Sequence, residues 1–378
     1  MDLDHIRGQI VQILGKEMLH HKQLESLSNG VAGVIKAGAL GIHAIGEAYA
    51  QLASTDPKHG IKQVDRSLNN PAFNIENILK PWVTFILGQR KQIVLALDWT
   101  DFDDDDHTTL CAYAMTNHGR ATPLAWKTVQ KSELQDHRGW YETQMIERLH
   151  GAFEPEIDIT LLADRGFGDQ KFYEFLEVSG WDFIIRFRQN ILVEYQGHTQ
   201  PAGHWLLPKG RARMMRQVRV TAEKTKVPAV VIARERKMKE TWCLATTHKD
   251  RSAAEIVKLY GKRFTIEETF RDQKDMRFGM GLRATHIGIP ERRDRLLLLA
   301  ALAQVLLTLL GAAAEEIGLD RRLKANTVKR RTHSLFRQGC HWYGAIPKMQ
   351  PERLYLLLEA FGRILARRTD LKEILAVI

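Results

Sequence analysis

Residues 92–98 read QIVLALD, a short run of β-branched and apolar side chains that ends in an aspartate. The pattern recurs at 157–164, IDITLLAD, which also ends in an aspartate. Short apolar runs of this kind predict buried strands. In an open α/β sheet, ligands bind at the carboxyl ends of adjacent parallel strands, so we expect Asp98 and Asp164 to lie side by side at such an edge.

The segments around these runs predict the rest of a sheet. Two apolar runs, 108–116 and 121–129, follow the first strand and are joined by the turn NHGR. A helical stretch at 139–153 precedes the second aspartate-ending run, and the Gly-rich turn RGFGD and another helix lead to a fifth run at 181–188. Three strands, helix, strand, helix, strand is the order of a ribonuclease-H-like α/β sheet, which is the fold we predict.

Changes of pattern divide the chain into five regions. Residues 1–90 carry apolar side chains at helix spacing and predict an all-helical domain. Residues 189–247 consist of short alternating runs separated by Gly and Pro, which indicates a β-rich insertion. We therefore expect the ribonuclease-H-like domain in two parts, 91–188 and 248–318, followed by a basic helical region at 319–378.

The composition favours a polyanionic partner. The 378 residues carry a formal net charge of +10, and residues 185–240 hold thirteen Lys or Arg against four Glu. Such a charge suits nucleic acid or an anionic membrane, and charge alone does not separate the two. Cys111, Cys243 and Cys340 lie far apart without a CxxC pair, which argues against a zinc site or a disulfide framework and fits a reducing cytoplasm.

One apolar segment raises the question of a membrane. Residues 296–314 contain no charge over nineteen positions, near the lower length for a membrane span. The segment is rich in alanine and contains Gln304 and Thr308, and the regions on both sides are basic, so no positive-inside asymmetry exists. We expect a buried core helix in a soluble protein, and the first residues lack the apolar core of a signal peptide.

A stretch at 260–274, YGKRFTIEETFRDQK, places reactive side chains on one stripe of a predicted helix. At roughly 100° per residue, four of them fall within an arc of about 60°: Tyr260, Arg263, Glu267 and Lys274. Glu268 points about 100° away, so the register selects Glu267 as the candidate acid. Taken alone, a solvated helix with ordinary ion pairs is the commoner origin of such a stripe.

The three acids together have the chemistry of a metal site. Close carboxylates repel one another unless a cation neutralises them, and hard oxygen ligands favour Mg²⁺ or Mn²⁺. Asp98, Asp164 and Glu267 would hold two ions roughly 3.5–4 Å apart that clamp the attacking and leaving oxygens of a phosphodiester. A single aspartate after a strand is more often a turn former or helix cap, and we expect such a role for Asp101 and Asp169.

Two further stretches carry clustered charges. Lys58, Lys62 and Arg66 form one basic helical edge, which either contacts phosphates or is a solvated face. The DDDD run at 103–106 lacks the Gly and the final Glu of a calcium loop, so we expect a solvated loop there.

The spacing of Tyr260, Arg263, Glu267 and Lys274 resembles the YREK signature of the insertion-sequence-four family of bacterial transposases, which are DDE enzymes. The likeness is greatest to the transposases of transposon ten. It rests on pieces spread along the chain: KHGIKQVDR, LALDWTD, LLADRGF, IEETFRDQK, GMGLR and ANTVKRR.

The resemblance implies roles for individual residues. Asp98, Asp164 and Glu267 would be the catalytic acids that bind Mg²⁺, or Mn²⁺ in its place, with two ions in each site. The DNA-binding residues would be Tyr260, Arg263, Lys274 and Trp242. In related transposases a tryptophan at the end of the inserted β-domain stacks on a flipped base, worth about 1–3 kcal/mol, although the spacing around Trp242 differs and a core aromatic is the alternative.

The resemblance also implies cut-and-paste transposition. Water nicks one strand at the element end, the freed 3′-hydroxyl attacks the opposite strand to form a hairpin, a second water opens it, and the same hydroxyl joins target DNA. The partners would be double-stranded DNA, as terminal inverted repeats bound by the N-terminal helices and as target, and a second copy of the chain in the synaptic homodimer. The setting would be the bacterial cytoplasm, at the nucleoid.

Three other functions are compatible with the same residues. A structure-specific endonuclease of the same fold would cut DNA without strand transfer, and an inactive derivative would only bind DNA. A membrane-associated basic protein would depend on the apolar segment at 296–314.

Overall fold

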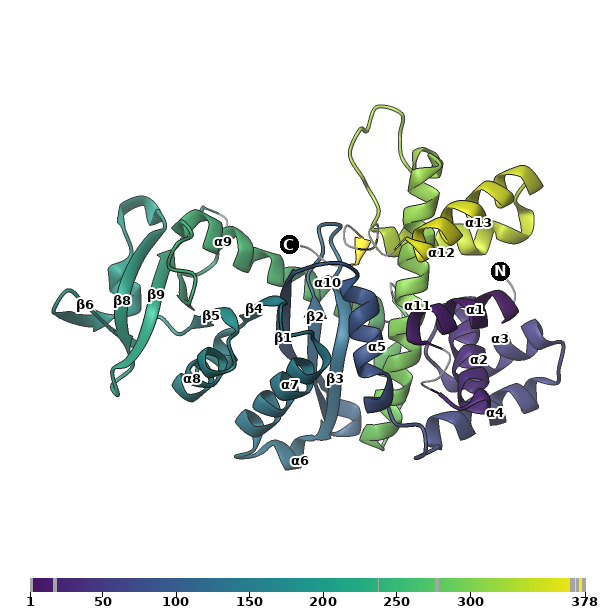
Figure 1. Cartoon of the computed structure of the whole chain (residues 1–378), viewed down its shortest axis with the longest axis horizontal. Coiled ribbons are helices and arrows are strands. Elements are labelled where there is room, and N and C mark those ends of the chain that lie inside the picture. The colour runs from purple at the N-terminus through teal and green to yellow at the C-terminus, as the bar shows by residue number, and fades with distance from the viewer. Residues whose placement is uncertain are drawn as a thin grey trace.

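The computed structural model describes residues 3–15, 19–236, 238–275, 279–367, 371 and 374–375. Figure 1 shows a central α/β sheet, with helices from both ends of the chain packed on one side of it and a β-rich arm extending to the other. The rest of the predicted C-terminal region, 368–370, 372–373 and 376–378, lies outside the described residues.

Within the described residues, ten strands form one sheet in the order β3-β2-β1-β4-β5-β10-β9-β8-β6-β7. The first five follow the predicted order of three strands, helix, strand, helix, strand, and β1, β4 and β5 are parallel to one another. The mixed α/β fold is confirmed, and its central order is consistent with a ribonuclease-H-like domain. The strands are β1 (Gln92–Phe102), β2 (His107–Ala114), β3 (Thr122–Gln130), β4 (Asp158–Ala163), β5 (Asp182–Phe187), β6 (Leu192–Tyr195), β7 (His198–Pro201), β8 (Arg213–Val220), β9 (Thr225–Ala233) and β10 (Trp242–Thr246).

The parallel pairing of β1 with β4 ends at Leu97 opposite Ala163. Asp98 and Asp164 are each the next residue along, so the register sets them beside one another at this end of the ladder. The expectation that Asp98 closes its strand was wrong, because β1 continues to Phe102 by pairing with β2, which places Asp98 opposite Cys111. Continued antiparallel pairing keeps the strand extended after the parallel partner has ended.

The β-rich region at 189–247 belongs to the same sheet. Its last strand, β10, pairs antiparallel with β5, and β9 and β8 follow on that edge. The predicted insertion therefore extends the central sheet, and its strands form the arm at the left of Figure 1.

The helices depart from expectation near the candidate acid Glu267. The expected single helix across 260–274 is broken, because α9 ends at Gly261 and a 3₁₀ turn, Lys262–Phe264, precedes α10. The helices are α1 (Leu3–Leu14), α2 (His21–Ala37), α3 (Ile42–Ala53), α4 (Pro57–Asn69), α5 (Glu76–Leu87), α6 (Lys131–Leu134), α7 (Arg138–Ala152), α8 (Gln170–Val178), α9 (Ala253–Gly261), α10 (Thr265–Lys274), α11 (Pro290–Glu316), α12 (Leu335–Ala345) and α13 (Pro351–Ala366).

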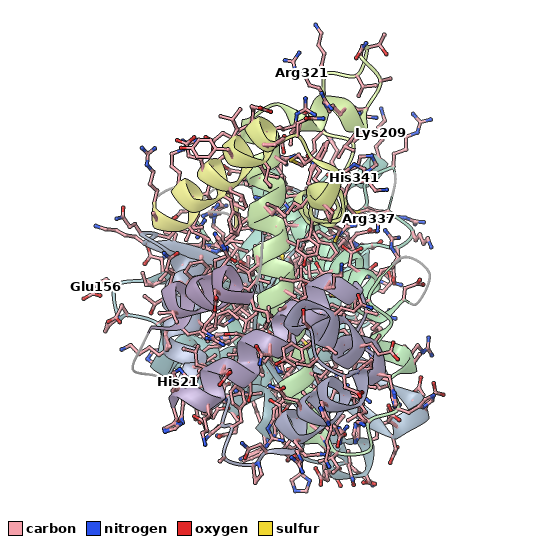
Figure 2. The ribbon with its side chains drawn as sticks, turned by 90° about the vertical axis from the view of Figure 1, so that its right-hand side faces the viewer. His21, Glu156, Lys209, Arg321, Arg337 and His341 are labelled. Carbon is pink, nitrogen blue, oxygen red and sulfur yellow. The ribbon has the colours of Figure 1, made fainter. Side chains whose placement is uncertain are left out.

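The long apolar helix α11 is the central support of the molecule. It packs against β3, α2, α12 and α13, and Figure 2 shows it running behind the N-terminal helices. Its contact with α12 is so close that a Cβ on Gly339 would lie 1.8 Å from the Leu307 carbonyl oxygen. Among the described residues, α11 is the one helix long and apolar enough to cross a membrane, and 94% of its most apolar window is buried inside the protein. The prediction of a core helix is confirmed.

Candidate active site

Asp98 and Asp164 reach the same edge of the sheet by different local structures. Asp98 lies within β1, and its side chain is 19% exposed. Asp164 follows β4 directly and caps the 3₁₀ turn Arg165–Phe167, because one carboxylate oxygen accepts a hydrogen bond of 2.7 Å from the Gly166 amide. Phe167 anchors that turn in the core. The capping role expected of an ordinary aspartate is therefore real at Asp164, and it leaves the second carboxylate oxygen available.

Arg263 connects two of the three predicted acids. Its Nη1 donates a hydrogen bond of 3.0 Å to Asp98 Oδ2, and its Nη2 lies 4.0 Å from Glu267 Oε1. The guanidinium is almost fully buried, whereas the Glu267 side chain is 60% exposed. Arg263 stands in the 3₁₀ turn between α9 and α10, so the break in the predicted helix is the point from which it reaches β1.

The environment of Asp98 disfavours its charge. Burial raises the pKa of Asp98 to about 6; Arg263 opposes this rise and the negative charge of Asp164 adds to it. Arg263 offsets this effect only in part, since the pKa of Asp98 stays raised. A further cation would relieve the repulsion between Asp98 and Asp164.

Three aromatic rings form one wall beside Arg263. The Trp242 ring meets Tyr260 edge-on, with centroids 5.0 Å apart, and stacks on Phe264 at 5.7 Å. Tyr260 is fully buried, its hydroxyl has no hydrogen-bond partner among the described residues, and burial raises its pKa to about 12. Trp242 is half-buried and Phe264 is exposed. Tyr260 thus supports the wall from beneath, and direct contact with DNA would require one of the other rings to move.

Lys274 lies about two turns beyond Glu267 in α10 and also faces β1. Its ammonium donates a hydrogen bond of 2.7 Å to the Asp101 carbonyl and lies 4.3 Å from the centre of the Phe102 ring. Burial lowers the pKa of Lys274 to about 8. Arg263 and Lys274 therefore both contact β1, although Arg263 stands in the 3₁₀ turn and Lys274 at the end of α10.

The neighbouring charges on α10 belong to another face. Glu268 forms ion pairs with Arg271 and with Arg120, whose Nη1 lies 3.6 Å away. Arg120 also pairs with the buried carboxylate of Asp272. Arg271 is thus engaged with an acid, and Glu268 is separate from the cluster around Asp98.

Two minor predictions can be compared with the contacts. Asp101 is exposed, and Asp169 caps α8 through a hydrogen bond of 2.9 Å from the Lys171 amide, as expected. The solvated loop predicted at 103–106 is only partly correct, because Asp105 forms a buried ion pair with Arg293. That arginine comes from α11, so local sequence contained no sign of the pairing.

A second group beside the acids, at the start of α7, was not among the predicted site residues. Glu142 is buried and accepts a hydrogen bond of 2.8 Å from the Trp99 indole and one of 3.1 Å from Arg138. The Arg138 guanidinium lies over the rings of Trp99, the residue after Asp98, and Phe167, three residues after Asp164. The available signal was the i, i+4 spacing of Arg138 and Glu142 on a predicted helix.

The donor set suits a divalent cation in its chemistry. Among the described residues, no three carboxylate, histidine or cysteine side chains are close enough to hold a metal ion together as they stand. Arg263 supplies the positive charge between Asp98 and Glu267 instead. Carboxylate oxygens are ligands that Mg²⁺ and Mn²⁺ prefer, and Glu267 would have to turn towards the two aspartates to join them.

A comparison with known families finds one match that covers this site. The family described as "Transposase DDE domain" matches residues 90–306, which is 217 of the 378 residues. The matched region begins just before β1 and ends within α11, so it contains the three acids and the whole stripe from Tyr260 to Lys274. No curated protein matches the chain.

Proposed function

The chain belongs to the DDE transposase family, and from that premise we propose that it carries out cut-and-paste transposition of an insertion sequence. Family membership makes it a DNA transposase, an enzyme that cleaves and transposes DNA, and implies the use of divalent metal ions. The finer assignment to the insertion-sequence-four family, on the side of transposon ten, rests on the spacing of Tyr260, Arg263, Glu267 and Lys274.

The proposed catalytic residues are Asp98, Asp164 and Glu267. The observation that carries this proposal is the register of β1 and β4, which aligns the first two acids at one edge of the sheet. Glu267 is the acid of α10 that faces them, since Arg263 links it to Asp98. These residues would hold Mg²⁺, or Mn²⁺, as two ions, which when bound lower the pKa of water and offset charge on the leaving oxygen.

The other residues of the stripe would hold DNA. Arg263 is already a cation at the acids, and once a metal ion neutralises them its guanidinium can pair with a phosphate. Lys274 carries a second positive charge towards the end of β1. Trp242 is the proposed stacking platform for a flipped base, using the ring face that does not meet Phe264, and Tyr260 would hold that ring in place.

We propose the order of steps expected for this family. Water attacks a phosphodiester at the element end and leaves a 3′-hydroxyl; that hydroxyl attacks the opposite strand and forms a hairpin. A second water opens the hairpin, and the 3′-hydroxyl then attacks target DNA. No protein–DNA adduct is expected, because the Tyr260 hydroxyl is buried and its pKa is raised to about 12.

The test of the site uses charge-neutral variants. Asp98→Asn, Asp164→Asn and Glu267→Gln should each lose strand cleavage and keep nearly normal affinity for element-end DNA. Asp101→Asn and Glu268→Gln are matched controls, since they neutralise adjacent acids outside the cluster, and they should cut normally. A variant of the first set that cuts at the wild-type rate would remove that residue from the site.

A second assay separates transposition from simple cutting. Wild-type protein, element-end DNA, target plasmid and Mg²⁺ should yield joined products. Cleavage without joining would favour the structure-specific endonuclease, and the absence of both reactions would favour an inactive DNA-binding derivative.

The N-terminal helices, 1–90, are the proposed binding region for terminal inverted repeats, and the active form is proposed to be a synaptic homodimer.

A further inference from the structure

A polar hollow lies between the start of α2 and the outer face of α4, remote in sequence from the catalytic acids. Its volume is about 720 Å³. The lining includes Lys22 and Ser26 from α2 and Lys62, Gln63, Arg66 and Asn70 on or just after α4. No carboxylate lines it, so its charge is positive.

The cations of this hollow have no carboxylate partner within the described residues. Lys22, Lys62 and Arg66 are exposed and form no ion pair within the part of the chain that the structure describes. The acids nearby are occupied elsewhere: Asp56 lies 3.5 Å from Lys58, and Asp65 lies 2.6 Å from Arg292. The basic edge that the sequence left ambiguous therefore has its charge facing an open space.

Helix α4, which carries Lys62 and Arg66, is held in place by its contacts with α3. Three residues, 54–56, join α3 to α4, the kind of connection found in helix-turn-helix motifs. The two helices touch through glycines, since a Cβ on Gly60 would lie 2.2 Å from the Gly46 carbonyl oxygen. Val64 and Leu68 bury the inner face. The outer face of α4 is thus presented on a fixed support.

Consecutive residues at the start of α11 tie this helix to the catalytic sheet. Arg292 binds Asp65 at 2.6 Å and Asn69 at 2.7 Å, both on α4. Arg293, the next residue, pairs with Asp105 and lies 4.0 Å from the centre of the Phe102 ring at the end of β1. The hollow therefore has a fixed position relative to β1, the strand that carries Asp98.

We propose that the α2–α4 hollow binds the phosphate backbone of duplex DNA through Lys22, Lys62 and Arg66, and that Arg292 and Arg293 hold this DNA in register with the catalytic acids. Lys62 and Arg66 stand one turn apart, about 6 Å along the axis of α4, a spacing suited to successive phosphates rather than a single anion. The identity of the nucleic acid rests on the proposed function.

The test measures binding of the full chain to a fluorescein-labelled, mixed-sequence DNA duplex. Lys22→Ala, Lys62→Ala and Arg66→Ala should each bind several-fold more weakly, and each should reduce the slope of log affinity against log salt by about 1. Lys36→Ala is the matched control, because this exposed lysine lies near the end of α2 and outside the hollow. Unchanged affinity and slope in all three variants would overturn the proposal.

Further experiments identify which anion binds the hollow and whether Arg292 couples the hollow to DNA nicking. Phosphatidylserine vesicles and inorganic phosphate should compete poorly with the duplex; vesicle binding that the same variants abolish would replace DNA with a membrane surface. If either alanine variant misfolds, the double variant Lys62→Gln/Arg66→Gln replaces it, because glutamine keeps a long side chain without the charge. It should show the same weaker DNA binding. Arg292→Gln should keep most DNA affinity but slow nicking of element-end DNA, and normal nicking would remove the coupling.

This result can be told apart from failure of the proposed function. If the hollow variants bind like wild type while Asp98→Asn still loses nicking, only the hollow is wrong. If wild type neither nicks nor joins DNA while the hollow variants lose affinity, the hollow stands and the catalytic proposal fails.

Discussion

At the residue scale, Arg263 determines the charge balance among the acids. It is nearly buried, it contacts Asp98 at 3.0 Å and Glu267 at 4.0 Å, and Asp164 adds a further negative charge nearby. A metal ion entering this cluster competes with the Arg263 guanidinium for the carboxylates of Asp98 and Glu267. Metal binding must therefore break the ion pairs of Arg263 with these acids. DNA phosphate is the natural new partner for Arg263.

The first prediction concerns metal affinity without DNA. Arg263→Gln should bind Mn²⁺ at least about tenfold more tightly than wild type, because two unit charges about 4 Å apart interact by about 4 kcal/mol at an effective dielectric constant of 20. Isothermal titration calorimetry measures the effect.

Two variants control this experiment. Lys262→Gln removes a neighbouring cation that binds Asn117 at 3.3 Å instead of the acids, and should leave Mn²⁺ affinity unchanged. Asp98→Asn in either background should weaken binding strongly. Equal affinities in Arg263→Gln and wild type would show that the guanidinium does not compete with the ion.

At the element scale, two contacts between helices and their neighbours decide how the site is held. Gly60 brings α4 onto α3 at backbone contact, which sets the direction of the basic face. Asp294 joins the start of α11 to β3, since its carboxylate accepts a hydrogen bond of 2.9 Å from the Thr128 amide and its carbonyl accepts one from Trp126. Each contact can be tested by a single substitution.

The second prediction is that Gly60→Ala destabilises the protein by about 1–3 kcal/mol, because the added methyl group overlaps the Gly46 carbonyl. Urea denaturation gives the free energy of unfolding. Gly151→Ala is the control within α7: its Cβ would meet nothing within 4 Å, and this variant should be as stable as wild type or more stable by up to about 1 kcal/mol. Equal stability of Gly60→Ala and wild type would mean that α3 and α4 separate easily.

The third prediction concerns pH. Burial raises the pKa of Asp294 to about 7, so the folded state holds the proton more tightly than the unfolded state. Stability from this group is then greatest below about pH 4 and falls as pH rises towards 7, by on the order of 2–4 kcal/mol. Asp294→Asn keeps an oxygen for the Thr128 amide and should lack this fall.

The measurement is the free energy of unfolding of wild type and variant between about pH 4 and 8. The exposed Asp250→Asn should follow wild type. A constant difference between Asp294→Asn and wild type across the range would contradict the assignment of a raised pKa to this carboxyl.

At the scale of the whole molecule, α11 joins the N-terminal helices to the sheet that carries Asp98. Its first turns contact α4 and the end of β1, and its apolar length packs against α2, β3, α12 and α13. This accounts for an apolar segment of membrane-spanning length inside a chain of net charge +10.

The fourth prediction follows from that burial. The protein should not float with neutral phosphatidylcholine liposomes, because α11 has no exposed apolar face to insert. Binding to anionic liposomes, if seen, should disappear with added salt, as expected for surface charge alone. Flotation with neutral liposomes at high salt would revive the membrane-associated alternative.

Local pattern was sufficient for the elements and for much of the candidate site. Apolar runs predicted the strand order, the 66-residue separation of Asp98 and Asp164 was compatible with adjacent strands, and helix register preferred Glu267 to Glu268. The core position of α11 also followed from its composition. These properties depend on side-chain periodicity and on the chirality of α/β units, and both are set by residues close together in the sequence.

Long-range pairing determined the rest. β1 runs past Asp98 because β2 continues beside it, the β-rich region joins the central sheet through β10 and β5, and the 3₁₀ turn lets Arg263 reach Asp98 across 165 residues of sequence. Arg292 and Arg293 likewise point to different partners although they are adjacent. The sequence by itself determined the order of strands and helices along the chain; the tertiary structure decided which charges neutralise one another, because that depends on distances between residues far apart in the chain.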